Sequence, residues 1–170
     1  TLMVDDLQPD PDLPLIIGVD FGLTPAAAIA QRTRKGQWNV IHEIVTEDMG
    51  LERFCLLLKQ ELNLLFPNYS LQIYGDPAGL SRDQVYETTA FDHMKTHGLM
   101  AKPCVSNEWK VRREALASPM TRLVDGKPAF RVDRKCVKIR KSLAGGYHFK
   151  RVAIYNQVLS DEELKSISAI

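Results

Sequence analysis

Two aspartates that end apolar segments are the residues of this sequence best placed to do chemistry. Asp20 lies at the end of the apolar run 15–21, before a turn that contains glycine and proline, and Asp76 ends a second run, 71–75, just before a proline. Short apolar runs bounded by turn residues are typical of buried strands. A carboxylate at the end of such a strand is costly to bury unless it is paired or bound to a metal.

Two strands that end side by side would bring both carboxylates to one edge of a sheet. Oxygen ligands of this kind suit Mg²⁺ or Mn²⁺. Two such ions roughly 3.5–4 Å apart can activate a water and stabilise the leaving oxygen of a phosphodiester. The pair therefore predicts a site for one or two ions and hydrolysis of a phosphodiester. The alternative for each aspartate is a turn or capping residue.

The rest of the chain supplies the elements that must position this pair. The patterns predict strands at 15–21, 26–32, 38–45, 71–74 and 99–105, helices at 47–65, 82–97 (capped by Ser81), 109–118 and 160–170, and an extended hairpin over 120–132. Because strand 71–74 follows a helix, we expect it to run parallel to strand 15–21. This order predicts an α/β fold with a mixed sheet, an antiparallel meander plus parallel strands, flanked by helices.

Length and composition bound the class of protein. A chain of 170 residues with 45% hydrophobic side chains fits one globular domain. Residues 1–14, acidic and proline-containing, are expected to form a linker or tail, which leaves 15–170 as the domain. No apolar run reaches the roughly 20 residues that cross a bilayer. Cys55, Cys104 and Cys136 are expected to be buried thiols, which fits a reducing cytoplasm.

The net charge of +1 conceals an uneven distribution. Residues 1–101 carry 7 basic and 14 acidic side chains, whereas residues 102–151 carry 14 basic and 4 acidic ones. Such a basic segment is a candidate phosphate-binding face, and the alternative is a solvated face with scattered ion pairs. The candidate contacts are Lys110, Arg112, Arg113, Arg134, Lys135, Arg140, Lys141, Lys150 and Arg151.

Three motifs, in order and spacing, resemble the ribonuclease-H-like nuclease domain of phage terminase large subunits. They are Gly18–Pro25, Tyr74–Gly79 and a segment from Pro128 through the Gly-Gly-Tyr sequence to Arg151, and they cover most of residues 15–151. The resemblance implies a ribonuclease-H-like fold. It also implies a nuclease domain that acts within a DNA-packaging motor.

By this resemblance Asp20 and Asp76 are catalytic and are the first two metal-binding carboxylates. The family has a third acid on a helix beyond the Gly-Gly-Tyr region, and Asp161, which opens the predicted helix 160–170, is the candidate here. The family's Ser-, His- and Asp-rich motif is not plainly present around it. The alternative is that Asp161 only favours the N-terminus of its helix through the helix dipole.

The resemblance implies a Mg²⁺- or Mn²⁺-dependent endonuclease domain, a hydrolase that cuts double-stranded concatemeric DNA with little sequence specificity. The implied partners are double-stranded DNA, the terminase ATPase domain, the small terminase subunit and the portal, in the cytoplasm of a bacterial host. The sequence has no G-x-x-x-x-G-K-[ST] motif, so we expect no P-loop ATPase in this chain.

Three alternatives remain open. A resolvase or transposase of the same fold would use the same carboxylates on branched or end-specific DNA. A sugar-kinase- or actin-like ATPase shares the opening Gly-x-Asp-x-Gly pattern but needs two lobes. A catalytically incomplete DNA-binding or docking module would keep the fold without the cleavage.

Overall fold

The computed structural model describes residues 3–81, 88–106 and 108–146. Within them the strands are β1 (Met3–Val4), β2 (Leu15–Asp20), β3 (Ala26–Arg32), β4 (Trp38–Val45), β5 (Leu71–Gly75), β6 (Ala101–Pro103), β7 (Leu123–Val124), β8 (Lys127–Pro128) and β9 (Phe130–Asp133). The helices are α1 (Leu51–Leu65), α2 (Ala90–Thr96), α3 (Trp109–Thr121) and α4 (Val137–Lys141), with a 3₁₀ turn η1 (Pro77–Leu80) and a π-helical turn η2 (Ser142–Gly146).

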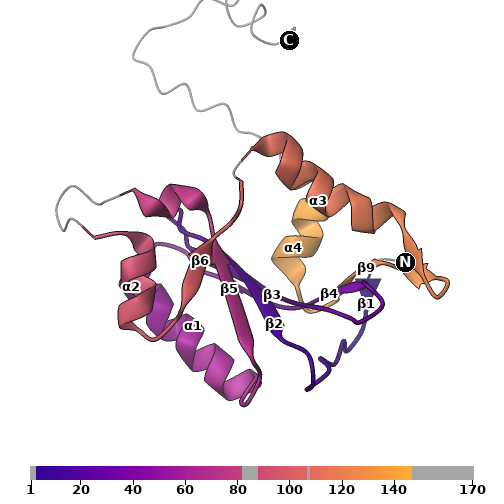
Figure 1. Cartoon of the computed structure of the whole chain (residues 1–170), viewed down its shortest axis with the longest axis horizontal. Coiled ribbons are helices and arrows are strands. Elements are labelled where there is room, and N and C mark those ends of the chain that lie inside the picture. The colour runs from indigo at the N-terminus through magenta and orange to yellow at the C-terminus, as the bar shows by residue number, and fades with distance from the viewer. Residues whose placement is uncertain (1–2, 82–87, 107, 147–170) are drawn as a thin grey trace, which may run out of the picture.

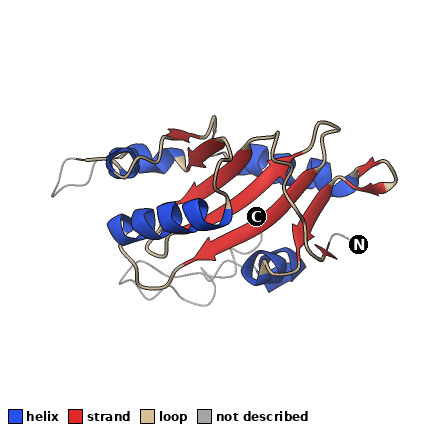
Figure 2. Ribbon diagram, turned by 90° about the horizontal axis from the view of Figure 1, so that it is seen from below, coloured by secondary structure: helices blue, strands red, loops and turns tan. Residues whose placement is uncertain are grey.

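The main sheet is mixed, as predicted. Its strand order is β1-β9-β4-β3-β2-β5-β6. β2, β3 and β4 form the antiparallel meander, while β5 runs parallel to β2, β6 parallel to β5, and β9 parallel to β4. Figure 2 shows these strands as one twisted layer with helices packed on it. The α/β fold and the parallel pairing of the strand that follows the first helix are therefore confirmed.

Each face of the sheet carries its own hydrophobic cluster. On one face Ile17 and Ile29 pack with Phe54 of α1 and with α2. On the opposite face Val132 packs with side chains of α3 and α4, among them Ile139. Alternate residues of a strand point to opposite faces, and this alternation separates the two clusters. Figure 1 shows α1 and α2 together on one side of the strands and α3 and α4 together on the other.

Helix α1 begins at Leu51, four residues after the predicted start. Asp48 adopts a φ of 50°, in the left-handed region that does not continue a helix. Gly50 is then the N-cap, in an extended conformation. The apolar periodicity over 51–65 was thus correctly interpreted, but the turn chemistry just before it moved the boundary.

Helix α2 starts later than predicted. Thr89 is its N-cap: the Thr89 hydroxyl accepts from the backbone N–H of Asp92 at 3.1 Å, and the Asp92 carboxylate accepts from the backbone N–H of Thr89 at 3.0 Å. Ser81, expected to cap this helix, instead ends η1 in an extended conformation. The predicted residues 82–87 lie outside the described part of the chain. Among the described residues the cap is therefore Thr89.

The predicted hairpin over 120–132 is confirmed only around its turn. Helix α3 continues to Thr121, so the first two residues of the first predicted strand, 120–124, are helical. Only β7 and β8 form a short hairpin. β9 instead joins the main sheet between β4 and β1, where Phe130 and Val132 enter the second hydrophobic cluster. Burial of these side chains outweighs the local hairpin preference.

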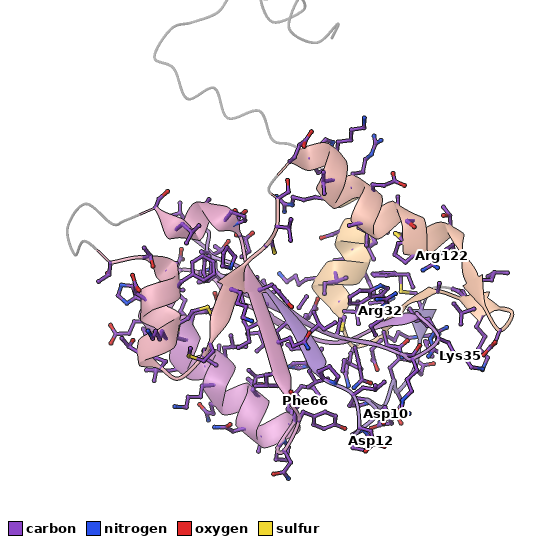
Figure 3. All side chains as sticks on the ribbon, viewed as in Figure 1. Asp10, Asp12, Arg32, Lys35, Phe66 and Arg122 are labelled. Carbon is purple, nitrogen blue, oxygen red and sulfur yellow. The ribbon has the colours of Figure 1, made fainter. Side chains whose placement is uncertain are left out.

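Residues 3–14, the described part of the segment that was expected to be a linker or tail, pack against the domain. β1 pairs with β9 in parallel, and the Leu7 side chain is buried in the first cluster. The Gln31 side-chain amide accepts from the backbone N–H of Asp10 and donates to the carbonyl of Asp10, both at 2.8 Å. Figure 3 shows Asp10 and Asp12 together beside the strands at the edge of the molecule.

The Asp133 carboxylate ties this segment to the sheet. It is 2% exposed. It accepts from the backbone N–H of Leu7 at 2.8 Å and from the backbone N–H of Lys135 at 3.0 Å. A buried carboxylate is tolerated when backbone donors satisfy it in this way. Asp133 therefore has a structural role.

Replacing Asp133 with alanine is expected to lower the free energy of unfolding by about 1–3 kcal/mol, because buried N–H groups lose their acceptor. Urea denaturation followed by circular dichroism measures the change. The matched control is Asp12→Ala, since Asp12 is exposed, and it is expected to change stability by less than about 0.5 kcal/mol. Equal stabilities for the two variants would contradict this role of Asp133.

Candidate active site

Asp20 and Asp76 lie at neighbouring positions of the sheet edge. β2 and β5 are parallel, with Val19 in register with Gly75. Asp20 and Asp76 each follow one member of this pair. Neighbouring strands lie about 4.8 Å apart. The sequence-based prediction that two strands deliver their carboxylates side by side is therefore matched by the register of the sheet.

The same local device orients each carboxylate. Oδ1 of Asp20 accepts from the backbone N–H of Gly22 at 3.0 Å. Oδ1 of Asp76 accepts from the backbone N–H of Ala78 at 2.8 Å and so caps η1. Aspartate favours such turns because its short side chain reaches the backbone two residues on. Both aspartates thus form the turn or capping hydrogen bond that was the alternative prediction for them. In each case this bond engages one carboxylate oxygen, Oδ1.

The ring of Phe21 holds the two aspartate-bearing loops together. A Cβ on Gly79 would lie 2.5 Å from Cδ2 of Phe21, and a Cβ on Gly75 would overlap the same ring. The other side of the contact is Phe91 of α2, whose ring centroid is 5.1 Å from that of Phe21 at an interplanar angle of 77°. This edge-to-face packing needs glycine at both positions. It couples the loop after β2 to the loop after β5.

The aspartate pair stands between two hollows. The first, which we call the α3 hollow, has a volume of about 520 Å³ and is lined by Asp20, Asp76, Ala26, Ala28, Val111 and Arg112 among others. The second, the α2 hollow, has a volume of about 460 Å³ and is lined by Asp20, Asp76, Phe21, Ser81, Thr88 and His93 among others. A chain molecule crossing the aspartates would therefore find space on both sides of them.

Arg112 brings a positive charge to the α3 hollow. Its guanidinium Nη1 lies 4.0 Å from Oδ2 of Asp76. Glu43 adds a third acid to the wall of this hollow, but its carboxylate already accepts from the backbone N–H groups of Lys138 and Ile139 at 2.7 and 2.8 Å. Glu43 thus holds the start of α4, whereas Arg112 faces the aspartate pair.

The donor set of Asp20 and Asp76 fits Mg²⁺ or Mn²⁺. Carboxylate oxygens are the hard ligands that these ions prefer. Mg²⁺ commonly binds through one or two carboxylates together with water and substrate phosphates. Among the residues that the structure describes, no group of three or more His, Cys, Asp or Glu side chains could hold an ion. Asp161, the predicted third acid, lies outside these residues.

The predicted basic contacts fall into two sets. Lys110 and Arg113 on α3 and Lys141 on α4 are exposed, as is Arg112. These two helices also carry residues that line the α3 hollow, Val111 on α3 and Ile139 on α4. Of these four basic residues, Arg112 lines the hollow that contains the aspartates, and the other three lie on the two helices that border it.

The second set consists of Arg134, Lys135 and Arg140, whose side chains contact other residues of the fold. Arg134 Nε lies 2.8 Å from Oδ1 of Asp5, and Lys135 Nζ lies 3.8 Å from Oδ2 of Asp133. Arg140 donates to the carbonyl oxygen of Arg134 at 2.8 Å. These contacts favour a structural part for the three residues. The candidates Lys150 and Arg151 lie outside the described part of the chain.

Thr88 and His93 are site residues that the sequence patterns did not reveal. Thr88 lies two residues before the first residue of α2 and His93 lies on α2, and the hydroxyl of Thr88 lies 3.0 Å from Nε2 of His93. Neither residue has a motif spacing to Asp20 or Asp76. Only the packing of α2 against the sheet places them at the wall shared with the aspartates.

The three cysteines differ in environment. Cys55 and Cys136 are buried, as predicted, but Cys104 is exposed, so the prediction is wrong for this residue. Burial raises the pKa of the Cys55 thiol to about 11 and that of the Cys136 thiol to about 12, with nearby carboxylates adding to the effect. A thiol with a raised pKa stays protonated and unreactive at neutral pH.

A maleimide carrying a bulky group is expected to label Cys104 alone at pH 7.5. Cys104 lines the α3 hollow. The added group should therefore displace the substrate from the aspartates and lower the rate of any reaction there about tenfold or more. Mass spectrometry counts and locates the adduct. The Cys104→Ser variant serves as the control and should resist the reagent. Labelling of Cys55 or Cys136 in the folded protein would contradict this arrangement.

No helix in the described ranges is long and apolar enough to cross a bilayer. This finding agrees with the absence of a long apolar run in the sequence.

The mixed sheet, with a meander and parallel strands flanked by helices, is a ribonuclease-H-like fold. Among solved structures with this fold, the nuclease domain of the P22 large terminase aligns over 84% of this chain and 73% of its own, with a TM-score of 0.63 and 11% identity. The large terminase nuclease domain of bacteriophage SPP1, solved with bound Mn, aligns over 98% of this chain and 90% of its own, with a TM-score of 0.55 and 16% identity.

The large terminase of the thermophilic bacteriophage D6E aligns over 82% of this chain with a TM-score of 0.62 and 11% identity, and the match spans only 33% of the D6E protein. No protein-family profile and no curated protein sequence matches this chain. The resemblance to terminase nuclease domains is thus confirmed for the fold.

Proposed function

We propose that this chain is a metal-dependent endonuclease domain of a viral DNA-packaging terminase. It hydrolyses phosphodiester bonds of double-stranded concatemeric DNA with little sequence preference. The observation that carries the proposal is the register of β2 and β5, which sets Asp20 beside Asp76 at the wall of two hollows. The fold shared with terminase nuclease domains, one of them solved with Mn, supports it.

Asp20 and Asp76 hold one or two Mg²⁺ or Mn²⁺ ions in this proposal, and we assign Asp161 as a third ligand. The chemistry supplied by the bound metal is activation of a water and neutralisation of charge on the leaving 3′ oxygen. The backbone N–H groups of Gly22 and Ala78 keep one oxygen of each aspartate in place. The two carboxylates are thereby oriented before substrate arrives, which lowers the cost of assembling the site.

The basic side chains hold the DNA backbone. Arg112 lies nearest the aspartates, and Lys110, Arg113 and Lys141 extend the basic face along α3 and α4. We include Arg134, Lys135, Arg140, Lys150 and Arg151 as further candidates for phosphate contacts. Such contacts position a duplex without reading its bases, so binding should weaken steeply as salt rises.

The partners and the cellular location are proposed from the same similarity to terminase nuclease domains. The domain would act with double-stranded DNA, the terminase ATPase domain, the small terminase subunit and the portal, in the cytoplasm of a bacterial host during viral assembly. ATP hydrolysis would come from the ATPase domain, in keeping with the lack of a P-loop motif in this sequence.

Plasmid cleavage tests the proposal. Purified protein is incubated with supercoiled plasmid in Mn²⁺, Mg²⁺ or EDTA, and nicked and linear forms are followed on a gel. We expect cleavage with Mn²⁺ or Mg²⁺ and none with EDTA, and a strongly reduced rate for Asp161→Asn. Cleavage that survives EDTA would overturn the metal-dependent mechanism.

An absence of cleavage together with salt-sensitive DNA binding would replace the proposal with the incomplete DNA-binding module. An absence of both cleavage and binding would reject a role on DNA. A rate for Asp161→Asn equal to that of the wild type would remove Asp161 from the set of metal ligands while leaving Asp20 and Asp76 in it.

A further inference from the structure

The wall of the α2 hollow contains polar residues that the proposed reaction does not yet use. Besides Asp20 and Asp76, these are Ser81, Thr88 and His93, and they lie among apolar residues such as Phe21 and Leu51. It lies across the aspartate pair from the α3 hollow, which holds Arg112. A DNA strand whose phosphate sits at the aspartates must continue in both directions. The α2 hollow is therefore the space available for the next nucleotide on one side.

His93 has a defined place in this wall. It is half-buried on α2, and its Nε2 lies 3.0 Å from the hydroxyl of Thr88. This contact limits rotation of the imidazole ring, whichever of the two groups donates the hydrogen. Helix α2 itself is anchored to the aspartate loops by the packing of Phe91 against Phe21. The position of His93 relative to the aspartates is thus fixed by packing on one side and by a hydrogen bond on the other.

We propose that the α2 hollow is a subsite for the DNA phosphate next to the scissile one, with His93 as its contact residue and Thr88 as the residue that positions His93. An imidazole and hydroxyl groups are donors suited to a phosphate oxygen. This inference rests on the proposed nuclease function. It deepens that function by naming where the strand runs and which side chain holds it.

Because the α2 hollow is lined by two carboxylates, we expect phosphate binding in the subsite to depend on a bound metal ion. Two carboxylates in its wall repel a phosphate when no cation is present. A bound divalent ion becomes the largest local charge and reverses this repulsion. Occupancy of the subsite should therefore require a divalent ion, whereas contacts to the exposed lysines and arginines of α3 should not.

The direct test compares His93→Gln with His97→Gln, a matched change at the end of the same helix and outside the wall of the hollow. Binding of a fluorescein-labelled 30-base-pair duplex is measured by anisotropy in Ca²⁺ and in EDTA, with DNA integrity checked on a gel. We expect His93→Gln to weaken binding in Ca²⁺ by about tenfold, the loss of one hydrogen bond to a charged group. In EDTA all three proteins should bind equally. Equal binding of His93→Gln and wild type in Ca²⁺ would overturn the subsite.

Phosphate interference locates the contact. Duplexes carrying one neutral methylphosphonate are cleaved with Mn²⁺ and the products are mapped to single nucleotides. For the wild type we expect cleavage to fall about tenfold at the bond adjacent to the modified phosphate on one side only. His93→Gln should lose this asymmetry because the contact is already gone. The same asymmetry in both proteins would contradict the assignment of His93.

Thr88 variants separate positioning from folding. We expect Thr88→Val to raise KM for DNA about threefold with kcat unchanged, and Thr88→Ser, which keeps the hydroxyl, to restore the wild-type KM. Equal KM values for Val and Ser would overturn the role of Thr88. If the wild type cleaves no DNA, the nuclease proposal fails by itself. The anisotropy comparison in Ca²⁺ then still decides whether His93 holds a phosphate.

Discussion

Asp20→Asn and Asp76→Asn are each expected to lower metal-dependent DNA cleavage by about 10³-fold or more. Loss of a ligand carboxylate removes several kcal/mol of transition-state stabilisation, and each 1.36 kcal/mol is a factor of ten in rate. Asparagine keeps the size of the side chain and an oxygen that accepts from Gly22 or Ala78. The change therefore removes charge and leaves the turn intact. Single-turnover cleavage of plasmid in Mn²⁺ measures the rate.

The control for this prediction is Asp12→Asn, an exposed acid away from both hollows. It should cleave like the wild type. All three variants should keep the free energy of unfolding within about 0.5 kcal/mol, because Asp12 and Asp20 are exposed and asparagine at position 76 keeps the acceptor that caps η1. Rates within a few-fold of the wild type for Asp20→Asn or Asp76→Asn would remove that residue from the catalytic pair.

Gly79→Ala is expected to damage the site through packing. The new Cβ would lie 2.5 Å from Cδ2 of Phe21. Overpacking of this kind costs about 1–3 kcal/mol in stability. If Phe21 moves to relieve the overlap, the loop after Asp20 shifts with it. A displacement of about 1 Å at an active site can cost 10²-fold in rate, so we expect cleavage to fall by about 10- to 100-fold.

Two further variants isolate the cause. Gly50→Ala places a Cβ where nothing lies within 4 Å and should leave stability and cleavage near the wild-type values. Adding Phe21→Leu to Gly79→Ala gives the new methyl group room, and the double variant should recover part of the lost rate, a non-additive result. Full stability and activity of Gly79→Ala alone would show that the Phe21 contact does not hold the loops in place.

Much of the sheet was predictable because its patterns are local. Strands 26–32 and 38–45 have the predicted bounds, and the parallel pairing of 71–75 with 15–20 follows from the helix between them. The repeated arrangement of an aspartate at a strand end, followed by turn residues, located Asp20 and Asp76. These features depend on neighbours in the sequence, which a pattern can reveal.

The elements that were missed depend on contacts between distant residues. β9 leaves its expected hairpin because Val132 finds a place in the second hydrophobic cluster. Met3 and Val4 form a strand within an acidic, proline-containing segment because β9 offers an unpaired edge. The start of α1 moved because Asp48 adopts a positive φ, a turn that apolar periodicity does not report.

The site was predicted only in part for the same reason. The Phe21 ring can pack against the loop after β5 only because Gly75 and Gly79, far along the chain, have no side chains. His93 lines the same hollow as the aspartates only because of the packing of α2. The approach of Arg112 to Asp76 likewise requires α3 to lie over the sheet edge. Charge counts marked the basic segment but could not choose Arg112 from the others.

The most direct test of the central claim is a calorimetric titration of the protein with Mn²⁺ in the absence of DNA. If Asp20 and Asp76 share an ion, the wild type binds Mn²⁺, and each single asparagine variant binds it at least about tenfold more weakly, which corresponds to 1.4 kcal/mol. Asp12→Asn should bind like the wild type. Unchanged affinity in both Asp20→Asn and Asp76→Asn would contradict the claim that these two carboxylates form the metal site.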